Sequence, residues 1–228
     1  MDFNLDSGPN WADSYTKLLA FNQTQYSRVI VIDSDSLLFD SLDELFFVQS
    51  APAVMPRAYW LSTPQMSSQI MLLTPSTEAF HKVQATMRRK AGYGFYDMEI
   101  MNYAFGRSCQ VMPHQTYDLL TGEFRSLDHA AFLGSQSAYG ENAWDPDAVF
   151  REAKMIHFSD HPLPKPWVAT DEQIRAAKPT CSFYAEVGKE CRAQEIWMDI
   201  YKTFREQRAV SYEPLQRVPK RLGRYPFS

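Results

Sequence analysis

The sequence predicts an α/β protein in which helices flank a mainly parallel sheet. Short apolar runs such as Val29–Ile32 alternate along the chain with longer amphipathic segments, a pattern typical of strands joined by helical crossovers. The chain has 228 residues, of which 45% are hydrophobic and 22% charged. This length and composition suffice for the core of one domain.

Apolar runs rich in β-branched residues predict the strands. Because such runs lack an alternating polar side chain, they indicate strands buried on both faces, as in the centre of a parallel sheet. The expected strands are 28–33, 52–55, 69–73, 109–112 and 154–158.

Apolar side chains at helical spacing predict the helices. In the first helix, Leu18, Leu19 and Phe21 would share one apolar face. Thr74 is the expected N-cap of the third helix, with Pro75 in its first turn, where a missing N–H costs nothing. The expected helices are 11–23, 41–46, 74–90, 96–105 and 193–207.

The two ends of the chain differ from its middle. We expect a polar tail over 1–10, one folded domain over 11–210 and a basic, solvated tail over 211–228. The net charge of −4 argues against a nucleic-acid partner. No run of about 18 apolar residues predicts a membrane span, and no signal-peptide pattern precedes Trp11. The oligomeric state is left open.

Glycine is scarce, at nine residues in 228, or about 4% against a usual 7%. Neither a G-x-x-x-x-G-K-[ST] loop nor a G-x-G-x-x-G turn occurs, which excludes the common glycine-rich phosphate-binding loops. A phosphorylated ligand would therefore need other groups to neutralise its charge.

Two aspartates in an Asp-x-Asp pattern follow the first strand. In extended chain, Asp33 and Asp35 would point to the same side, about 7 Å apart. Hard carboxylate oxygens at the ligand-binding edge of an α/β sheet suit Mg²⁺ or Mn²⁺. The alternative is that Asp33 caps a turn while Asp35 is solvated.

His157 ends another apolar run, and Lys165-Pro166-Trp167 follows it. A histidine after a strand is usually structural. As a third ligand beside two aspartates, however, it would favour Mn²⁺ over Mg²⁺, because imidazole is a softer donor. Lys165 near such a metal would contact a diphosphate, with Trp167 as a wall of the site.

Two further sequence features bear on the compartment. Cys181 and Cys191 would pair in an oxidising compartment and leave Cys109 free; otherwise all three are reduced thiols. Asn22-Gln23-Thr24 matches the N-glycosylation sequon, but its place beside an expected buried strand favours a chance match.

Nine short segments, taken in order, carry a resemblance to a known family. They are Thr16–Leu18, Thr24–Tyr26, Asp33–Asp35, Leu42–Phe46 and Lys165–Trp167, together with Ala53–Trp60, Tyr96–Ile100, Tyr117–Arg125 and His157–Asp160. The first five occur in this order in glycogenin-like glycosyltransferases of family 8. The other four resemble the fungal branch of that family, the Golgi N-acetylglucosaminyltransferases. The resemblance covers roughly residues 12 to 208.

The resemblance implies a GT-A fold and a retaining transfer of a sugar, GlcNAc foremost, from a UDP-sugar to a glycan acceptor. It implies Mn²⁺ held by Asp33, Asp35 and His157, with Mg²⁺ as the alternative ion. Asp97 would lie nearest the reacting centre, and Lys165 would stabilise the departing diphosphate. The implied substrate-binding residues are Lys17, Asp33, Ser34, Asp35, Ser68, Gln69, Asp97 and Lys165.

The sequence departs from the family pattern in three places. Ser67-Ser68-Gln69 replaces Asn-Ser-Gly, and Asp97-Met98-Glu99 replaces Asp-Gln-Gly; Glu99 would either contact substrate or be solvated. The family also begins with a strand–helix unit that grips the nucleoside, and only about ten polar residues precede Trp11. We therefore expect this unit to be absent. A Golgi lumenal location follows from the resemblance alone; without it the expectation would be cytoplasmic.

Two alternative functions remain at this stage. One is an inactive, N-terminally truncated glycosyltransferase remnant that binds sugar or glycan. The other is a phosphatase with Asp33 as a phosphorylated nucleophile and Asp35 as its acid/base. That superfamily also needs a later strand-terminal acidic pair, which the sequence does not offer in a suitable place.

Overall fold

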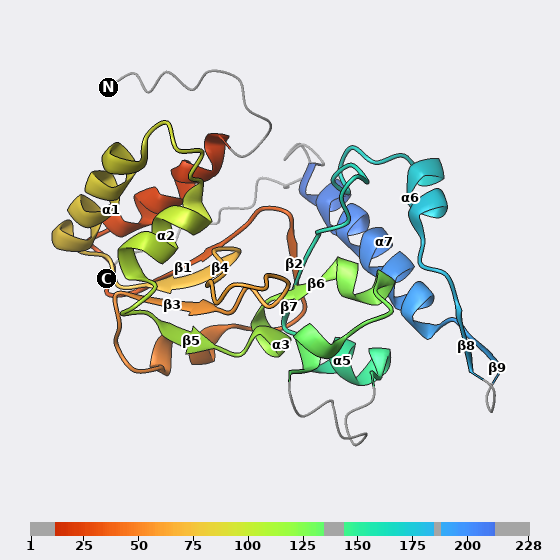
Figure 1. The fold of residues 1–228 in the computed structure, drawn as a ribbon. Helices are drawn as coiled ribbons and strands as arrows, with labels where there is room; N and C mark the ends of the chain where they lie inside the picture. The colour runs from red at the N-terminus through yellow and green to blue at the C-terminus, as the bar shows by residue number, and fades with distance from the viewer. Residues whose placement is uncertain (1–11, 135–143, 185–187, 213–228) are drawn as a thin grey trace, which may run out of the picture.

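Two sheets meet near the middle of the molecule in the computed structural model, which describes residues 12–134, 144–184 and 188–212 (Figure 1). The larger has the strand order β1-β4-β3-β5, and the smaller has the order β2-β7-β6. The strands of the larger sheet are β1 (Val29–Ile32), β4 (Ile70–Leu73), β3 (Ala53–Pro56) and β5 (Gln110–Met112). Those of the smaller are β2 (Ser36–Leu38), β7 (Met155–His157) and β6 (Leu119–Leu120).

The α/β class is confirmed, but the sheets are mixed rather than mainly parallel. β1 and β3 both pair antiparallel with β4, and β2 pairs antiparallel with β7. Only the β3–β5 and β6–β7 pairs in the described chain are parallel. The physical reason is that a continuous apolar run reports burial on both faces and carries no information about strand direction.

The first lobe consists of the larger sheet with three helices, η1 (Ala12–Asn22), α1 (Thr77–Lys90) and α2 (Asp97–Phe105). Its core includes Leu18, Phe21, Met71 and Ile100. The expected start of α1 was two residues early: Ser76 is the N-cap and accepts the Ala79 N–H at 3.0 Å. The Thr74 hydroxyl donates instead to the Ala51 carbonyl at 2.7 Å, which ties the chain to the segment just before β3.

The first helix, η1, is a 3₁₀ helix, and this changes which side chains are buried. Leu18 and Phe21 are buried, but Leu19 is 53% exposed, so the predicted apolar face is wrong at that residue. A 3₁₀ helix has three residues per turn rather than 3.6. Its buried residues therefore repeat at intervals of three.

The second lobe consists of the smaller sheet and the short helices around it, and it packs on α7 (Arg192–Tyr212). This helix begins one residue before the expected helix and extends beyond it. Trp197 Nε1 and Tyr201 Oη both donate to the buried Asp160 carboxylate, at 3.1 and 2.8 Å. The remaining short elements of this lobe were not predicted, because their residues show no clear period. They are α3 (His114–Tyr117), η3 (Thr121–Arg125), α4 (Ala130–Leu133), α5 (Pro146–Glu152) and α6 (Asp171–Ala177).

A disulfide joins Cys181 to Cys191. These cysteines flank the hairpin of β8 (Ser182–Tyr184) and β9 (Gly188–Glu190), while Cys109 is free. The sequence left open whether these two cysteines are paired or reduced, and in the structure they are paired.

The other boundaries of the chain fall close to expectation. The helix expected at 41–46 is η2 (Asp43–Phe47). The tail predicted over 1–10 lies outside the described residues, as does most of the tail predicted over 211–228, so the predicted domain limits stay predictions.

Of the helices described, none is long and apolar enough to cross a lipid bilayer.

Candidate functional site

The Asp-x-Asp segment lies where the two sheets meet. Asp33 directly follows β1, and Asp35 directly precedes β2. His157 ends β7 and pairs in register with Ser36, so strand pairing brings it beside Asp35. The segment forms a turn rather than the expected extended chain.

Asp33, Asp35 and His157 form a cluster of three ligand-type side chains. One donor atom from each lies within 4.8 Å of the other two. Metal–ligand bonds of about 2 Å allow donors around one ion to lie up to about 4 Å apart. Small side-chain rotations would therefore let the cluster hold a divalent cation, and a set of two carboxylates and one imidazole suits Mn²⁺.

We call Asp35, His157 and Lys165 the open half of this site after Lys165, whose side chain is 39% exposed. Asp35 itself has a side chain that is only 16% exposed. Its Oδ2 is 3.3 Å from His157 Nε2 and 2.5 Å from Lys165 Nζ. Burial opposes the charged carboxylate, but the hydrogen bonds to His157 and Lys165 outweigh it and hold the pKa of Asp35 well below its usual range. Lys165 Nζ also donates to the Phe158 carbonyl at 2.6 Å. Asp35 is thus firmly ionised at neutral pH.

Asp33 belongs to the closed half, which we define as Lys17, Asp33, Ser68 and Asp97. Lys17 Nζ lies 2.6 Å from an oxygen of each aspartate and 3.0 Å from the Ser68 carbonyl oxygen. Burial works against the Lys17 charge, yet the two carboxylates outweigh it and raise its pKa. Burial raises the pKa of Asp33 despite the opposing effect of Lys17.

Asp97 is fixed in this half from two directions. The Ser68 hydroxyl donates to its Oδ2 at 2.5 Å, and its own backbone N–H donates to Ser14 Oγ at 3.4 Å. Because Asp97 is the first residue of α2, its carboxylate is also favoured by the helix dipole. Lys17 therefore connects the Asp-x-Asp turn to the residue that the resemblance places nearest the reaction.

Ser34 and Gln69 contribute less through their side chains. Ser34 is exposed in the turn between the two aspartates. The Gln69 carbonyl accepts the Asp33 N–H at 2.9 Å, which fixes the start of the turn. Within the described chain, Gln69 Oε1 is buried and has no hydrogen-bond partner, so this acceptor is unused.

Asp118 is a buried carboxyl that the sequence did not single out as a site residue. It has 0% exposure, and among the described residues neither of its oxygens has a hydrogen-bond partner. Burial raises its pKa to about 7, against the opposing influence of Ser67, His157 and Lys17. The one available signal was its position directly before β6, the strand that pairs with β7 beside His157.

Glu99 is half-buried rather than fully solvated. Its carboxylate accepts the Tyr96 N–H at 2.9 Å and so caps the start of α2. Further along this helix, the Asn102 amide donates to the Met66 and Met98 carbonyls, at 2.7 and 2.8 Å. Glu99, which stands where the family pattern has glycine, therefore serves as a cap of α2.

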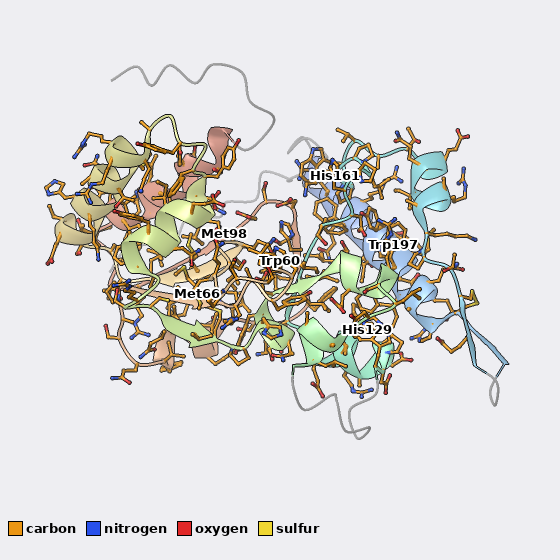
Figure 2. The ribbon with its side chains drawn as sticks, viewed as in Figure 1. Trp60, Met66, Met98, His129, His161 and Trp197 are labelled. Atoms are coloured by element: carbon orange, nitrogen blue, oxygen red, sulfur yellow. A yellow bond between two sulfur atoms is a disulfide. The ribbon has the colours of Figure 1, made fainter. Side chains whose placement is uncertain are left out.

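Near the middle of the molecule, large side chains come from both lobes. In Figure 2, Trp60 lies between them, with Met66 and Met98 on the side of the first lobe. Trp167 is 41% exposed and packs 6.0 Å from the Phe204 ring on α7. Trp167 is therefore anchored to the second lobe while part of its side chain stays exposed, and its role as a wall of the site stays a prediction.

Comparison with known proteins connects the chain to two fungal proteins, both named glucose N-acetyltransferase 1. The Gibberella zeae protein is 44% identical over 87% of this chain and 43% of its own length. The Aspergillus fumigatus protein is 42% identical over 90% of this chain and 56% of its own length. The chain is a relative of these fungal proteins. It spans about half of their length.

More distant comparisons agree with this relationship. Mouse glycogenin-1 is 23% identical over 86% of the chain and 54% of its own length, which fits the glycogenin-like family 8. The solved structure of the glycosyltransferase GlyE of Streptococcus pneumoniae matches 87% of the chain and 47% of its own, with a TM-score of 0.52 and 13% identity. The GT-A fold is confirmed. No protein-family model matches the chain.

Proposed function

We propose that this protein transfers GlcNAc from UDP-GlcNAc to a glycan acceptor, with retention at the sugar and with Mn²⁺. The observation that carries the proposal is the convergence of Asp33, Asp35 and His157 with two lysines where the sheets meet. Relatives named glucose N-acetyltransferase support the sugar, because they match most of this chain at 42–44% identity.

The three ligand-type side chains would hold the metal. Asp35 supplies a carboxylate that is ionised well below neutral pH, and His157 presents Nε2 toward it at 3.3 Å. A divalent cation held there would neutralise negative charge on the donor diphosphate. Gln69 Oε1 and His157 Nδ1 are both buried without a partner among the described residues, which supports a polar ligand beside the cluster.

The two lysines supply the remaining positive charge. Lys165 is 39% exposed, so its ammonium group can turn from Asp35 toward the leaving diphosphate. Lys17 is nearly enclosed and stays between Asp33 and Asp97. Fixed cations aimed at a leaving group act most strongly in a site that excludes water. The two lysines would neutralise phosphate charge, as a glycine-rich loop does in other phosphate-binding sites.

Asp97 would lie closest to the sugar in this arrangement. Its carboxylate is held by Ser68 and Lys17 at 2.5 and 2.6 Å, which fixes its orientation before a donor binds. A preoriented carboxylate can stabilise the positive charge that develops on a sugar ring as the glycosidic bond breaks. We infer this role for Asp97 and keep Asp33 and Asp35 for the metal and nucleotide.

A lumenal location, which we propose to be the Golgi, is supported by the disulfide between Cys181 and Cys191. Disulfides persist in the secretory compartments and are rare where thioredoxin and glutathione keep thiols reduced. The pairing of these cysteines therefore favours the lumen over the cytoplasm.

The test is a turnover assay with UDP-GlcNAc and UDP-Glc, each with Mn²⁺ and with chelator, on the wild type and on Asp35→Asn. We expect metal-stimulated turnover, with preference for UDP-GlcNAc, that falls by about 10²-fold or more in the variant, because a lost metal ligand removes several kcal/mol of charge stabilisation. Asp40→Asn is the matched control, since this nearby carboxylate is 66% exposed and should leave turnover unchanged.

Three outcomes would contradict the proposal. Absence of uridine-nucleotide binding at millimolar concentration would refute it for this chain. Binding of UDP-GlcNAc without turnover would favour the inactive remnant. Turnover of p-nitrophenyl phosphate that is lost in Asp33→Asn would favour the phosphatase.

A further inference from the structure

The sequon Asn22-Gln23-Thr24 has surroundings that differ from those the sequence suggested. It is the one Asn-x-Ser/Thr sequence in the chain. Rather than lying against a buried strand, all three of its residues are exposed, and so are the next three, up to Ser27. The reason for treating the match as chance therefore no longer holds.

The three-residue period of η1 explains why Asn22 faces solvent. In a 3₁₀ helix, residues i and i+3 lie above one another and form three rows. One row, with Leu18 and Phe21, is buried in the core. A second row contains Lys17, which contacts Asp33 and Asp97. The third row consists of Thr16, Leu19 and Asn22, all exposed.

The segment after η1 keeps the sequon at the surface. The Gln23 N–H donates to the Ala20 carbonyl at 3.1 Å, and the Tyr26 N–H donates to the Gln23 carbonyl at 3.0 Å. These turns fold the backbone on itself while the side chains from Asn22 to Ser27 remain exposed. A bulky group on Asn22 would thus meet no buried neighbour in this segment.

The sequon is also remote from the candidate site. It precedes β1, whereas Asp33 follows the other end of that strand, and four residues of strand span about 13 Å. Along η1, Asn22 is five residues from Lys17, or about 10 Å at the rise of a 3₁₀ helix. A modification at Asn22 would therefore leave the metal cluster open.

We propose that Asn22 is an N-glycosylation site of this protein, an inference that rests on the proposed lumenal location. In the transfer, Asn22 Nδ2 forms a bond to the anomeric carbon of an oligosaccharide carried on a polyprenyl diphosphate. The bond from that carbon to the diphosphate oxygen breaks, the amide gives up one proton, and the polyprenyl diphosphate leaves. The Thr24 hydroxyl completes the acceptor sequence.

The glycan would cover exposed apolar surface next to its attachment point. Leu19 lies one turn before Asn22 in the same row and is 53% exposed, and Tyr26 in the following turn is 57% exposed. Sugars bound beside these side chains would shield them from water and from other chains. The glycan is therefore expected to improve the solubility of the protein and to leave its chemistry unchanged.

The test uses the full chain, directed into the secretory pathway of a yeast by a cleavable signal. We expect one glycan, seen as a mobility shift that peptide-N-glycosidase F removes, with conversion of Asn22 to aspartate in the peptide mass. The shift should be lost in Asn22→Gln and Thr24→Ala and kept in Thr24→Ser. Metal-dependent donor turnover should be the same in Asn22→Gln and the wild type.

The disulfide gives an internal control for passage through the lumen. Wild-type protein in which Cys181 and Cys191 are shown to be joined, but in which the Asn22 peptide is wholly unmodified, would overturn this inference while the donor assay stands on its own. Conversely, a glycan at Asn22 in a protein without donor turnover would support the inference and count against the proposed activity.

Discussion

Asp33 and Asp35 stand two residues apart, yet the two halves of the site give them opposite surroundings. In the closed half, Lys17 is shared by Asp33 and Asp97, and its side chain is only 15% exposed. In the open half, Asp35 contacts Lys165, whose side chain is 39% exposed. The pKa of Asp33 is raised by burial, whereas the pKa of Asp35 is lowered by its hydrogen bonds to His157 and Lys165.

This difference indicates a division of labour within one short turn. The enclosed ion pairs of the closed half hold η1, the turn and α2 together, so they contribute to the fold as well as to the site. The open half holds an exposed cation that can move to a ligand at little cost to stability. Each half should therefore respond to loss of its lysine in its own way.

Lys17→Met should have the largest effect on stability. It removes the one cation that Asp33 and Asp97 share at 2.6 Å each and leaves two largely buried carboxylates facing each other. Removing one partner of a buried ion pair costs about 3–5 kcal/mol. We expect a loss of this size in the free energy of unfolding, measured by urea denaturation with metal chelated.

Lys202→Met is the control for this substitution, because its side chain is 71% exposed and its pair with Glu206 spans 3.9 Å. It should change the free energy of unfolding by less than about 0.5 kcal/mol. Adding Asp97→Asn to Lys17→Met should restore part of the loss. If Lys17→Met proved as stable as the wild type, the closed half would have no structural role.

Asp118→Asn should alter the pH dependence of stability. Burial raises the folded-state pKa of Asp118 to about 7, from an ordinary value of about 4 in the unfolded chain. Between these values the folded state binds a proton that the unfolded state has lost. Stability must then fall as the pH rises from about 4 to 7. The loss is at most about 4 kcal/mol, since each pKa unit corresponds to 1.36 kcal/mol.

The measurement compares denaturation curves of the wild type and Asp118→Asn from pH 4 to 8 with metal chelated. The amide stays neutral, so the variant should lose less stability than the wild type over this range. Contributions from titrating groups that do not interact with Asp118 act in both proteins and cancel in the difference. Parallel curves would show that the Asp118 carboxyl ionises as easily in the folded protein as in the unfolded chain.

Lys165→Met should have the smallest effect on stability but a clear effect on turnover. Because this lysine is partly solvated, the free energy of unfolding should change by less than about 1 kcal/mol. Loss of a cation at the leaving diphosphate should lower kcat by about 10²-fold. Steady-state kinetics with UDP-GlcNAc and Mn²⁺ measure this effect, and unchanged kcat would remove Lys165 from the proposed chemistry.

Several parts of the site could be predicted from residue chemistry alone. The Asp-x-Asp segment after an apolar strand and the histidine ending another strand both indicated a metal site, and the structure brings their side chains together. Lys17 and Asp97 came only from the resemblance, because nothing in their local sequence marks them. Asp118 was missed, since a single aspartate before a two-residue strand gives no local signal of burial.

For the fold too, the sequence predicted local features but not contacts between distant segments. The main strands and helices of the first lobe were predictable, because long apolar runs and helical spacing are local properties of the chain. The antiparallel partners of β4 were not, because strand direction depends on which distant segments pair. The exposure of Leu19 was also missed, since the three-residue period of η1 depends on its packing against α1 and α2.

The sequence by itself determined the α/β class, the carboxylate and imidazole groups available to a metal, and the family resemblance, because these depend on residue type, order and local period. Only the tertiary structure decided how the charges are shared, which lysine is enclosed, and which face of η1 meets solvent. These are properties of contacts between residues far apart in the chain. Burial and the partners that folding supplies set the energy of a charge and the accessibility of a side chain.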